Sequence, residues 1–171
     1  MNPSYLRVRR PLEEAMARYG RWIGAPEIEP PQLVRDREAI DLALDGDNWR
    51  GLAVFIYAAG PWTVFEELSG GLAARPTESW LEFADGGDLV YAGYNDAIGY
   101  GELVYVEGGI LLRQFLQDEG DPGEDTNVGK LPHADGEPLT EWTDVAAWVD
   151  RDMEEVVTGA DQGWLWIHRA T

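Results

Sequence analysis

The stretch DLVYAGYNDAIGYGELVYV, residues 88–106, decides the fold of this chain. Two apolar, aromatic runs of strand length flank a central GYNDAIGYG, which holds three glycines, one asparagine and one aspartate. Glycine permits backbone turns that other residues resist, and asparagine and aspartate favour turns through bonds to nearby backbone. The stretch therefore predicts two antiparallel strands joined by a wide connection.

Further strands are predicted on both sides of this stretch. Downstream, the short glycine turn EGG (107–109) leads into ILLRQFL (110–116), as in a hairpin. Upstream, LAVFIYAAG (52–60) and WTVFEEL (62–68) form a second expected hairpin. The run GELVYV (101–106) is apolar on both faces, which indicates an interior strand covered on both sides. SWLEFA (79–84) fits either a strand or a helical turn.

Helices are predicted near both ends of the chain. Pro11 suits a first helical position, and apolar residues then recur at helical spacing up to residue 23. The residues that follow, 25–32, look like a proline-rich connector. LVRDREAIDLALDGD (33–47) favours a helix, although a strand over 39–44 is an alternative. A C-terminal helix is expected over about 141–157, before a last strand at 163–169. One side of the second expected helix carries Val34, Arg37, Ile40 and Leu44. The expected apolar stripe of the last helix comprises Trp142, Val145, Ala146, Val149, Met153 and Val156.

Together these segments predict one α+β domain over residues 1–171. It is expected to be a twisted antiparallel β-meander of about five or six strands, with N-terminal and C-terminal helices packed on it. The expected parts are a helical N-terminal segment (1–48), the meander (49–116), an acidic loop (117–138), and the C-terminal helix with the last strand (139–171).

The charge is the strongest global signal, with a net value of −19. Residues 1–50 carry eight arginines against nine acids, whereas residues 51–171 carry five basic groups against 23 acids. Such a field repels nucleic-acid phosphates and anionic lipids, so neither nucleic acid nor a membrane is an expected partner. It attracts a basic protein and speeds its capture, although acidity also serves solubility alone.

The chain offers little for catalysis. It has no cysteine and only two histidines, His133 and His168, and no serine stands in a nucleophile-elbow motif. No phosphate-binding motif is present, and the acids of 118–125 depart from a calcium-loop pattern. Glu66 with Glu67, or Asp96 with Glu102, would be a carboxylate pair of the glycosidase kind, although acids this frequent pair by chance. We expect no enzyme activity, no metal and no cofactor.

Two surfaces are candidates for binding a protein. Tyrosine beside carboxylates is typical of recognition surfaces that meet arginine or lysine. The alternative is that the wide connection is purely structural, with its tyrosines packed underneath. The first candidate surface comprises Asp88, Tyr91, Tyr94, Asn95, Asp96, Tyr100 and Glu102. The second, in the acidic loop, comprises Asp118, Glu119, Asp121, Glu124 and Asp125, with Asp135 and Glu137 further along.

The series WTVFEELSGGL, LVYAGYNDAIGYGELVYVEGGILLRQFLQDE and WTDVAAWVD resembles small acidic immunity proteins of bacterial polymorphic-toxin and interbacterial-competition systems, over about residues 62–150. The resemblance implies a cytoplasmic protein that binds and neutralises a cognate toxin, and the charge makes a basic toxin the expected partner. The alternative function is a non-catalytic module that binds carbohydrate or calcium.

Overall fold

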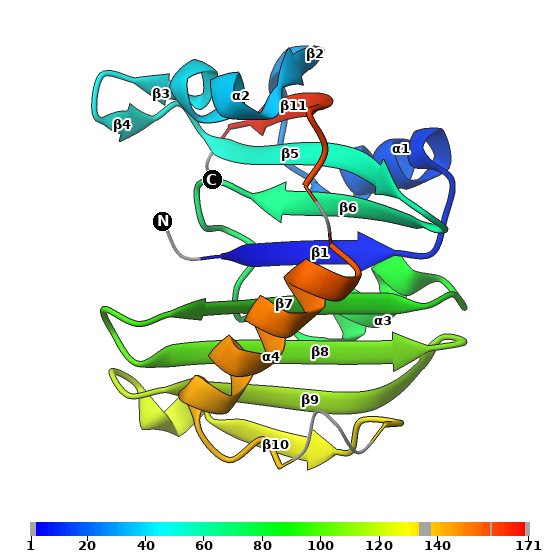
Figure 1. Cartoon of the computed structure of the whole chain (residues 1–171), viewed down its shortest axis with the longest axis vertical. Coiled ribbons are helices and arrows are strands. Elements are labelled where there is room, and N and C mark those ends of the chain that lie inside the picture. Colours follow the sequence, from blue (N-terminus) through cyan, green and yellow to red (C-terminus); the bar gives the residue numbers. More distant parts are fainter. Residues whose placement is uncertain (1–2, 134–137, 158, 170–171) are drawn as a thin grey trace.

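The computed structural model describes residues 3–133, 138–157 and 159–169, and within them one antiparallel sheet of nine strands forms the centre (Figure 1). Its strand order is β10-β9-β8-β7-β1-β6-β5-β11-β2. A separate small hairpin, β3 (Leu44–Asp45) with β4 (Asn48–Trp49), projects beside it. The strands of the large sheet are β1 (Ser4–Val8), β2 (Glu27–Arg35), β5 (Leu52–Ala59), β6 (Trp62–Glu67), β7 (Leu89–Asn95), β8 (Tyr100–Glu107), β9 (Ile110–Asp118), β10 (Thr126–Gly129) and β11 (Gln162–His168).

Helices cover both faces of the large sheet, which gives three layers. Buried residues of α1 (Leu12–Ile23) and α3 (Thr77–Ala84) share one apolar core with one sheet face. Buried residues of α2 (Asp36–Ala43) and α4 (Trp142–Glu155) share a second core with the other face. In Figure 1, α4 crosses in front of β7, β8 and β9, and α3 lies behind the sheet. The α+β class is therefore as expected.

Helix α1 matches its predicted bounds closely. Pro11 is its N-cap, and Gly24 ends it with φ of 66°, a left-handed conformation that glycine adopts without strain. Tyr19 and Ile23 lie on its buried side, as the helical spacing predicts. The periodic part of the sequence was thus sufficient to place this helix.

Strand β8 has the predicted interior position, with β7 and β9 as its neighbours. Leu103 packs into the core beneath α4, whereas Val104 and Val106 pack into the core beneath α3. The last helix was also expected, and it buries Val145, Trp148, Val149 and Asp152. The last strand is present as β11, with Trp164 and Trp166 packed in the core on the α1 side.

The predicted meander of about five or six strands is wrong in number and order, because the sheet has nine strands and consecutive strands are neighbours only within β7 to β10 and in the β5–β6 pair. Strand β1 lies between β6 and β7, and β11 lies between β5 and β2. Both insertions join strands that are distant in the sequence, and local patterns do not report such pairings. The N-terminal segment 1–48 is accordingly not only helical, since it supplies β1, β2 and β3.

The proline-rich stretch predicted as a connector is strand β2, at the edge of the sheet. An edge strand tolerates Pro30 and Pro31 because it needs ladder donors on one side only. The following helix, α2, buries Ala39 and Ala43, whereas Ile40 is 37% exposed. The side expected from the spacing, which carries Ile40, is therefore not the buried side of this helix.

The expected acidic loop at 117–138 is only partly a loop. Strand β9 extends to Asp118, a 3-10 turn occupies Pro122–Glu124, and β10 pairs with β9. Asp135 and Glu137 lie outside the described residues. SWLEFA (79–84) belongs to helix α3, which settles that alternative.

Candidate functional site

The two predicted surfaces meet at one end of the sheet. Strand β8 pairs with both β7 and β9, so the β7–β8 and β9–β10 connections lie side by side, at the left of Figure 1. The backbone N–H of Glu119 donates to the carbonyl of Gly99 at 3.3 Å, which joins the two connections directly. We call this surface the acidic end, and its acids are Asp96, Asp118, Glu119, Asp121, Glu124 and Asp125.

Three of these acids hold the connections in place. Glu119 accepts a hydrogen bond from the indole N–H of Trp142 at 3.2 Å, which ties the acidic end to the start of α4. Asp118 accepts from the N–H of Gly120, and Asp125 accepts from the N–H of Asp118. The carboxylates of Asp96, Asp121 and Glu124 are exposed and form no hydrogen bond or ion pair with another described residue. These three are free to meet a partner.

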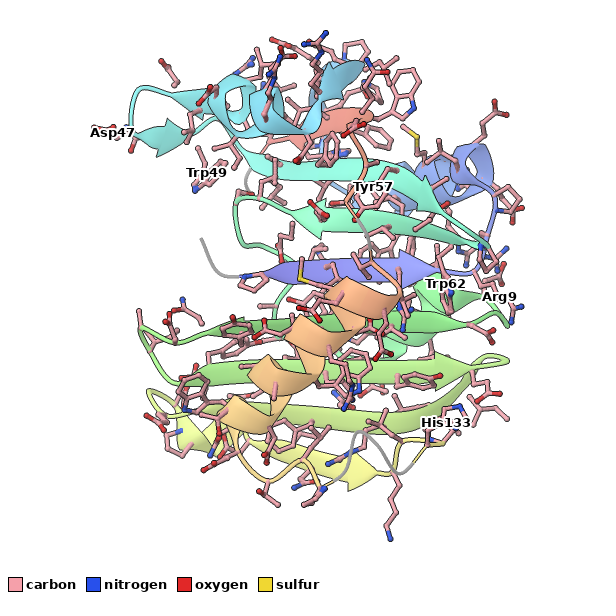
Figure 2. The ribbon with its side chains drawn as sticks, viewed as in Figure 1. Arg9, Asp47, Trp49, Tyr57, Trp62 and His133 are labelled. Carbon is pink, nitrogen blue, oxygen red and sulfur yellow. The ribbon has the colours of Figure 1, made fainter. Side chains whose placement is uncertain are left out.

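A cavity of about 570 Å³ opens beside the acidic end, where β6 and β7 end and β1 begins. Trp49, on the small hairpin, is 36% exposed and lies at this side of the molecule (Figure 2). Ile98, at the tip of the β7–β8 connection, is 53% exposed. Among the described lining residues none is basic; they are Ser4, Trp49, Glu67, Leu68, Ser69, Gly70, Ala73, Ala74, Tyr91, Gly93, Tyr94, Asn95, Ile98, Tyr100 and Asp118.

Glu67, at the end of β6, supplies a buried carboxylate to the cavity wall. It accepts hydrogen bonds from the Ser4 hydroxyl at 2.9 Å and from the backbone N–H groups of Gly71 and Leu72. Burial raises the pKa of Glu67, whereas these bonds and the Arg75 guanidinium act in the opposite direction. The β6–α3 connection therefore folds around this side chain.

Glu102, on β8, is a second carboxylate directly behind the wall. Its side chain is completely buried, and one oxygen accepts from the Tyr100 hydroxyl at 2.6 Å and from the N–H of Ala74 at 2.8 Å. The other oxygen, Oε1, has no hydrogen-bond partner. Burial raises the pKa of Glu102 to about 7, although both bonds favour the charged form. Both of its partners, Tyr100 and Ala74, line the cavity.

Only some of the predicted contact residues line the cavity, and two of them are buried. Some line the cavity, namely Tyr91, Tyr94, Asn95, Tyr100 and Asp118. Tyr91 is only 1% exposed and Glu102 is 0% exposed, so their prediction as surface contacts needs correction. Successive residues of a strand face opposite sides of the sheet. The side chains of Tyr91 and Glu102 both point to the face that carries α3, where they are covered.

Asp88 does not join the site, because it precedes β7 whereas the cavity lies at the other end of that strand. Its carboxylate accepts from the N–H of Gly108 at 2.8 Å and pairs with Arg9 at 3.4 Å. Figure 2 places Arg9 at the side of the molecule opposite Trp49. Asp88 is therefore a structural residue of the far end.

The carboxylate pairs considered from the sequence do not form. Glu66 accepts from the Tyr57 hydroxyl on the α2 and α4 face, whereas its neighbour Glu67 points to the α3 face. Asp96 is exposed and Glu102 is buried. The structure instead places Glu67 and Glu102 on one face, where the charge of Glu67 contributes to the raised pKa of Glu102.

Sequence reasoning missed several lining residues, including Ser4, Trp49, Glu67 and Ala74. They come from β1, β4, β6 and the β6–α3 connection, so no local motif unites them. The inserted position of β1 was the missing information, because Ser4 reaches the cavity only through that pairing.

No group of three or more histidine, cysteine, aspartate or glutamate side chains in the part of the chain that the structure describes is arranged to hold a metal ion. None of its helices combines the length and apolar character that crossing a membrane requires.

Comparison with known proteins identifies no relative for this fold and site. No family model, no curated protein and no solved structure matches the chain. The function is therefore argued from the geometry of the cavity and the acidic end.

Proposed function

We propose that this protein binds a basic protein partner through the acidic end and the adjoining cavity, and that it acts in the cytoplasm as an immunity protein against a bacterial toxin. One observation carries the proposal. Two acidic connections, separated in the sequence by the whole of β8 and β9, lie side by side at one end of the sheet, and a cavity opens there beside Tyr100, Ile98 and Asp118. The resemblance of residues 62–150 to immunity proteins supplies the biological context.

The surface has the composition that protein interfaces favour. Ile98 and Trp49 offer exposed apolar side chains at the cavity, and Asp118 of the acidic end lines it. Aromatic anchors in a partly dry centre provide most of the binding energy in many interfaces, whereas rim charges mainly set the rate and the choice of partner. The proposal gives the protein no catalytic role.

The distribution of charge supports the same face. At the opposite end, Arg9 pairs with Asp88, and Arg10 and Arg18 pair with Asp85. None of the described ion pairs involves the six acids of the acidic end. An approaching cationic protein is therefore drawn to the acidic end, because acids elsewhere are partly neutralised.

The test uses the basic protein encoded next to this gene, expressed with and without the chain. We expect the chain to protect cells from that protein and to bind it directly. Association should slow by about tenfold or more between about 0.01 M and 0.15 M salt, because screening shortens the electrostatic range from about 30 Å to 8 Å. A neighbouring protein that is harmless, or that does not bind, would overturn the proposal.

A matched pair of variants assigns the effect to the site. The test variant combines Asp96→Asn, Asp121→Asn and Glu124→Gln, and it should slow association and weaken protection. The control combines Glu13→Gln, Asp41→Asn and Glu78→Gln, which removes equal charge from exposed positions on α1, α2 and α3. Equal loss in both variants would mean that net charge alone matters and that the acidic end is not the interface.

A second candidate is a carbohydrate-binding module, because the cavity itself favours it. Its volume of about 570 Å³ lies in the range of small-ligand sites, and Trp49 and Tyr100 are aromatic lining residues. Saturable binding of a neutral sugar at the cavity, unaffected by salt, would favour this function. Calcium, the other ligand considered, has no matching set of acids in the described part of the chain.

A further inference from the structure

The cavity beside the acidic end combines an apolar, aromatic wall with buried carboxylates. Trp49 and Tyr100 supply aromatic side chains to the lining, and Leu68 and Ile98 supply aliphatic surface. Tyr94 also lines the cavity, but its ring packs on the α4 side, where its hydroxyl donates to Asp150. A cation with an apolar stem fits such a wall, because aromatic faces attract cations and the stem covers apolar surface. Arginine and lysine are the protein side chains with this build.

The charge behind the wall is unbalanced. Glu102 is completely buried, and none of the groups that shift its pKa is a cation. A buried carboxylate without a cation is unfavourable, and its Oε1 lacks even a hydrogen-bond donor. Glu67 differs, since Arg75 contributes a positive charge near it. Arg75 itself stacks over Trp22 at 4.5 Å from the ring centroid.

The mouth of the cavity adds to this charge. Asp118 lines the cavity and belongs to the acidic end, where Asp96, Asp121 and Glu124 are exposed. A cation on a partner thus meets exposed acids first, then Asp118, and then the field of the two buried glutamates. The volume of about 570 Å³ has room for one such side chain with part of the segment that carries it.

We propose that the cavity is the docking site for a cationic side chain, arginine or lysine, on a protruding segment of the basic partner. The inference rests on the proposed function for the identity of the partner. It goes further by naming the residues that would bind the partner's cationic side chain and the type of side chain that they would bind.

The test needs no toxin, so its failure and that of the proposed function are distinguishable. A short peptide with one arginine between glycines is titrated into the intact protein, beside a twin peptide with neutral citrulline. Backbone amide resonances are followed by two-dimensional nuclear magnetic resonance. We expect saturable shifts at Ser69, Ala74, Asn95 and Ile98 with arginine, and binding weaker by about tenfold with citrulline.

The pH dependence of the affinity for the arginine peptide supplies an independent test. A cation favours ionised Glu102, so arginine affinity should rise by several-fold between about pH 6 and pH 8. The groups that face Glu102 are Glu67 on β6, Tyr91 on β7 and Tyr100 on β8. The two tyrosines stay neutral in this interval because burial raises the pKa of each well above its usual range. The variant Glu102→Gln should lose most of the rise, whereas Asp88→Asn at the far end should keep it.

Three results would overturn the docking proposal. Equal affinity for arginine and citrulline would show that charge is not recognised. Shifts spread over the whole acidic surface, without a centre at the cavity, would show non-specific attraction. Free guanidinium or spermidine binding as tightly as the peptide would assign the cavity to a small cation and not to a protein segment.

Discussion

At the scale of single residues, Glu102 links the fold to the cavity. It lies on an interior strand among apolar side chains, and its two hydrogen-bond donors both line the cavity. A glutamine of the same shape would keep an acceptor for Tyr100 and Ala74 without the burial cost of a charge. The presence of an acid here costs stability at neutral pH, as residues retained for binding often do.

The pH dependence of stability tests this view of Glu102. In the unfolded chain this carboxyl loses its proton near its usual pKa of 4.5, whereas in the folded chain it keeps the proton up to about 7. The folded state therefore binds more protons in that interval, and stability falls as pH rises through it. The loss attributable to Glu102 is at most about 3 kcal/mol.

Thermal unfolding at several pH values measures the effect. The melting temperature of Glu102→Gln, relative to the natural chain, should rise between about pH 5 and pH 8. Asp96→Asn is the control, because that carboxylate is exposed and should leave the pH profile unchanged. A constant difference between Glu102→Gln and the natural chain would show that Glu102 does not carry this pH dependence.

At the scale of elements, the contact between β8 and α4 sets the shape of the acidic end. Gly101 faces the first residue of α4 so closely that an added Cβ would lie 2.9 Å from the Cα of Trp142. Trp142 also donates its backbone N–H to the side chain of Gln117 on β9 at 2.6 Å. The start of this helix thus rests directly on the two strands that carry the acidic connections.

Gly101→Ala tests that contact. The methyl group would meet helix backbone, which cannot move aside as a side chain does, so we expect a loss of about 1–3 kcal/mol in unfolding free energy. Denaturant titration measures it. Gly159→Ala is the control, because nothing lies within 4 Å of an added Cβ there. An unchanged midpoint for Gly101→Ala would mean that α4 does not pack on β8 this closely in solution.

At the scale of the whole molecule, the first and the last strand both lie in the interior of the sheet. Strand β1 fills the centre between β6 and β7, and β11 pairs with both β5 and β2. Trp166 on β11 packs against Tyr19 of α1 with ring centroids 5.9 Å apart. The last strand therefore connects the edge strand β2 to β5 and also packs against helix α1.

Removal of the last strand tests this topology. A chain that ends at Gly159 should fail to fold cooperatively, because β2 loses its only partner and β5 loses one of two. Circular dichroism and limited proteolysis measure the result. A chain that ends at Arg169 is the control, since it retains β11 in full. Cooperative unfolding of the shorter chain would show that β11 is peripheral.

The sequence by itself determined several of the local elements and, for α1 and β8, which residues are buried. Helical spacing placed α1, and the apolar runs of 52–68 and 88–116 placed five strands, because these periods arise from backbone geometry within one segment. The glycine-rich connection after β7 was also correctly predicted as a turn at a sheet end. Charge counting located the excess of acid beyond residue 50.

Only the tertiary structure decided which of these elements are neighbours. The period of two along a strand says which face a residue occupies and nothing about which strand lies alongside. The hydrogen bond between Ser4 and Glu67 in the cavity wall and the complete burial of Glu102 both depend on which segments pack together, and no local pattern encodes them. The physical reason is that strand pairing and burial depend on contacts between segments far apart in the chain.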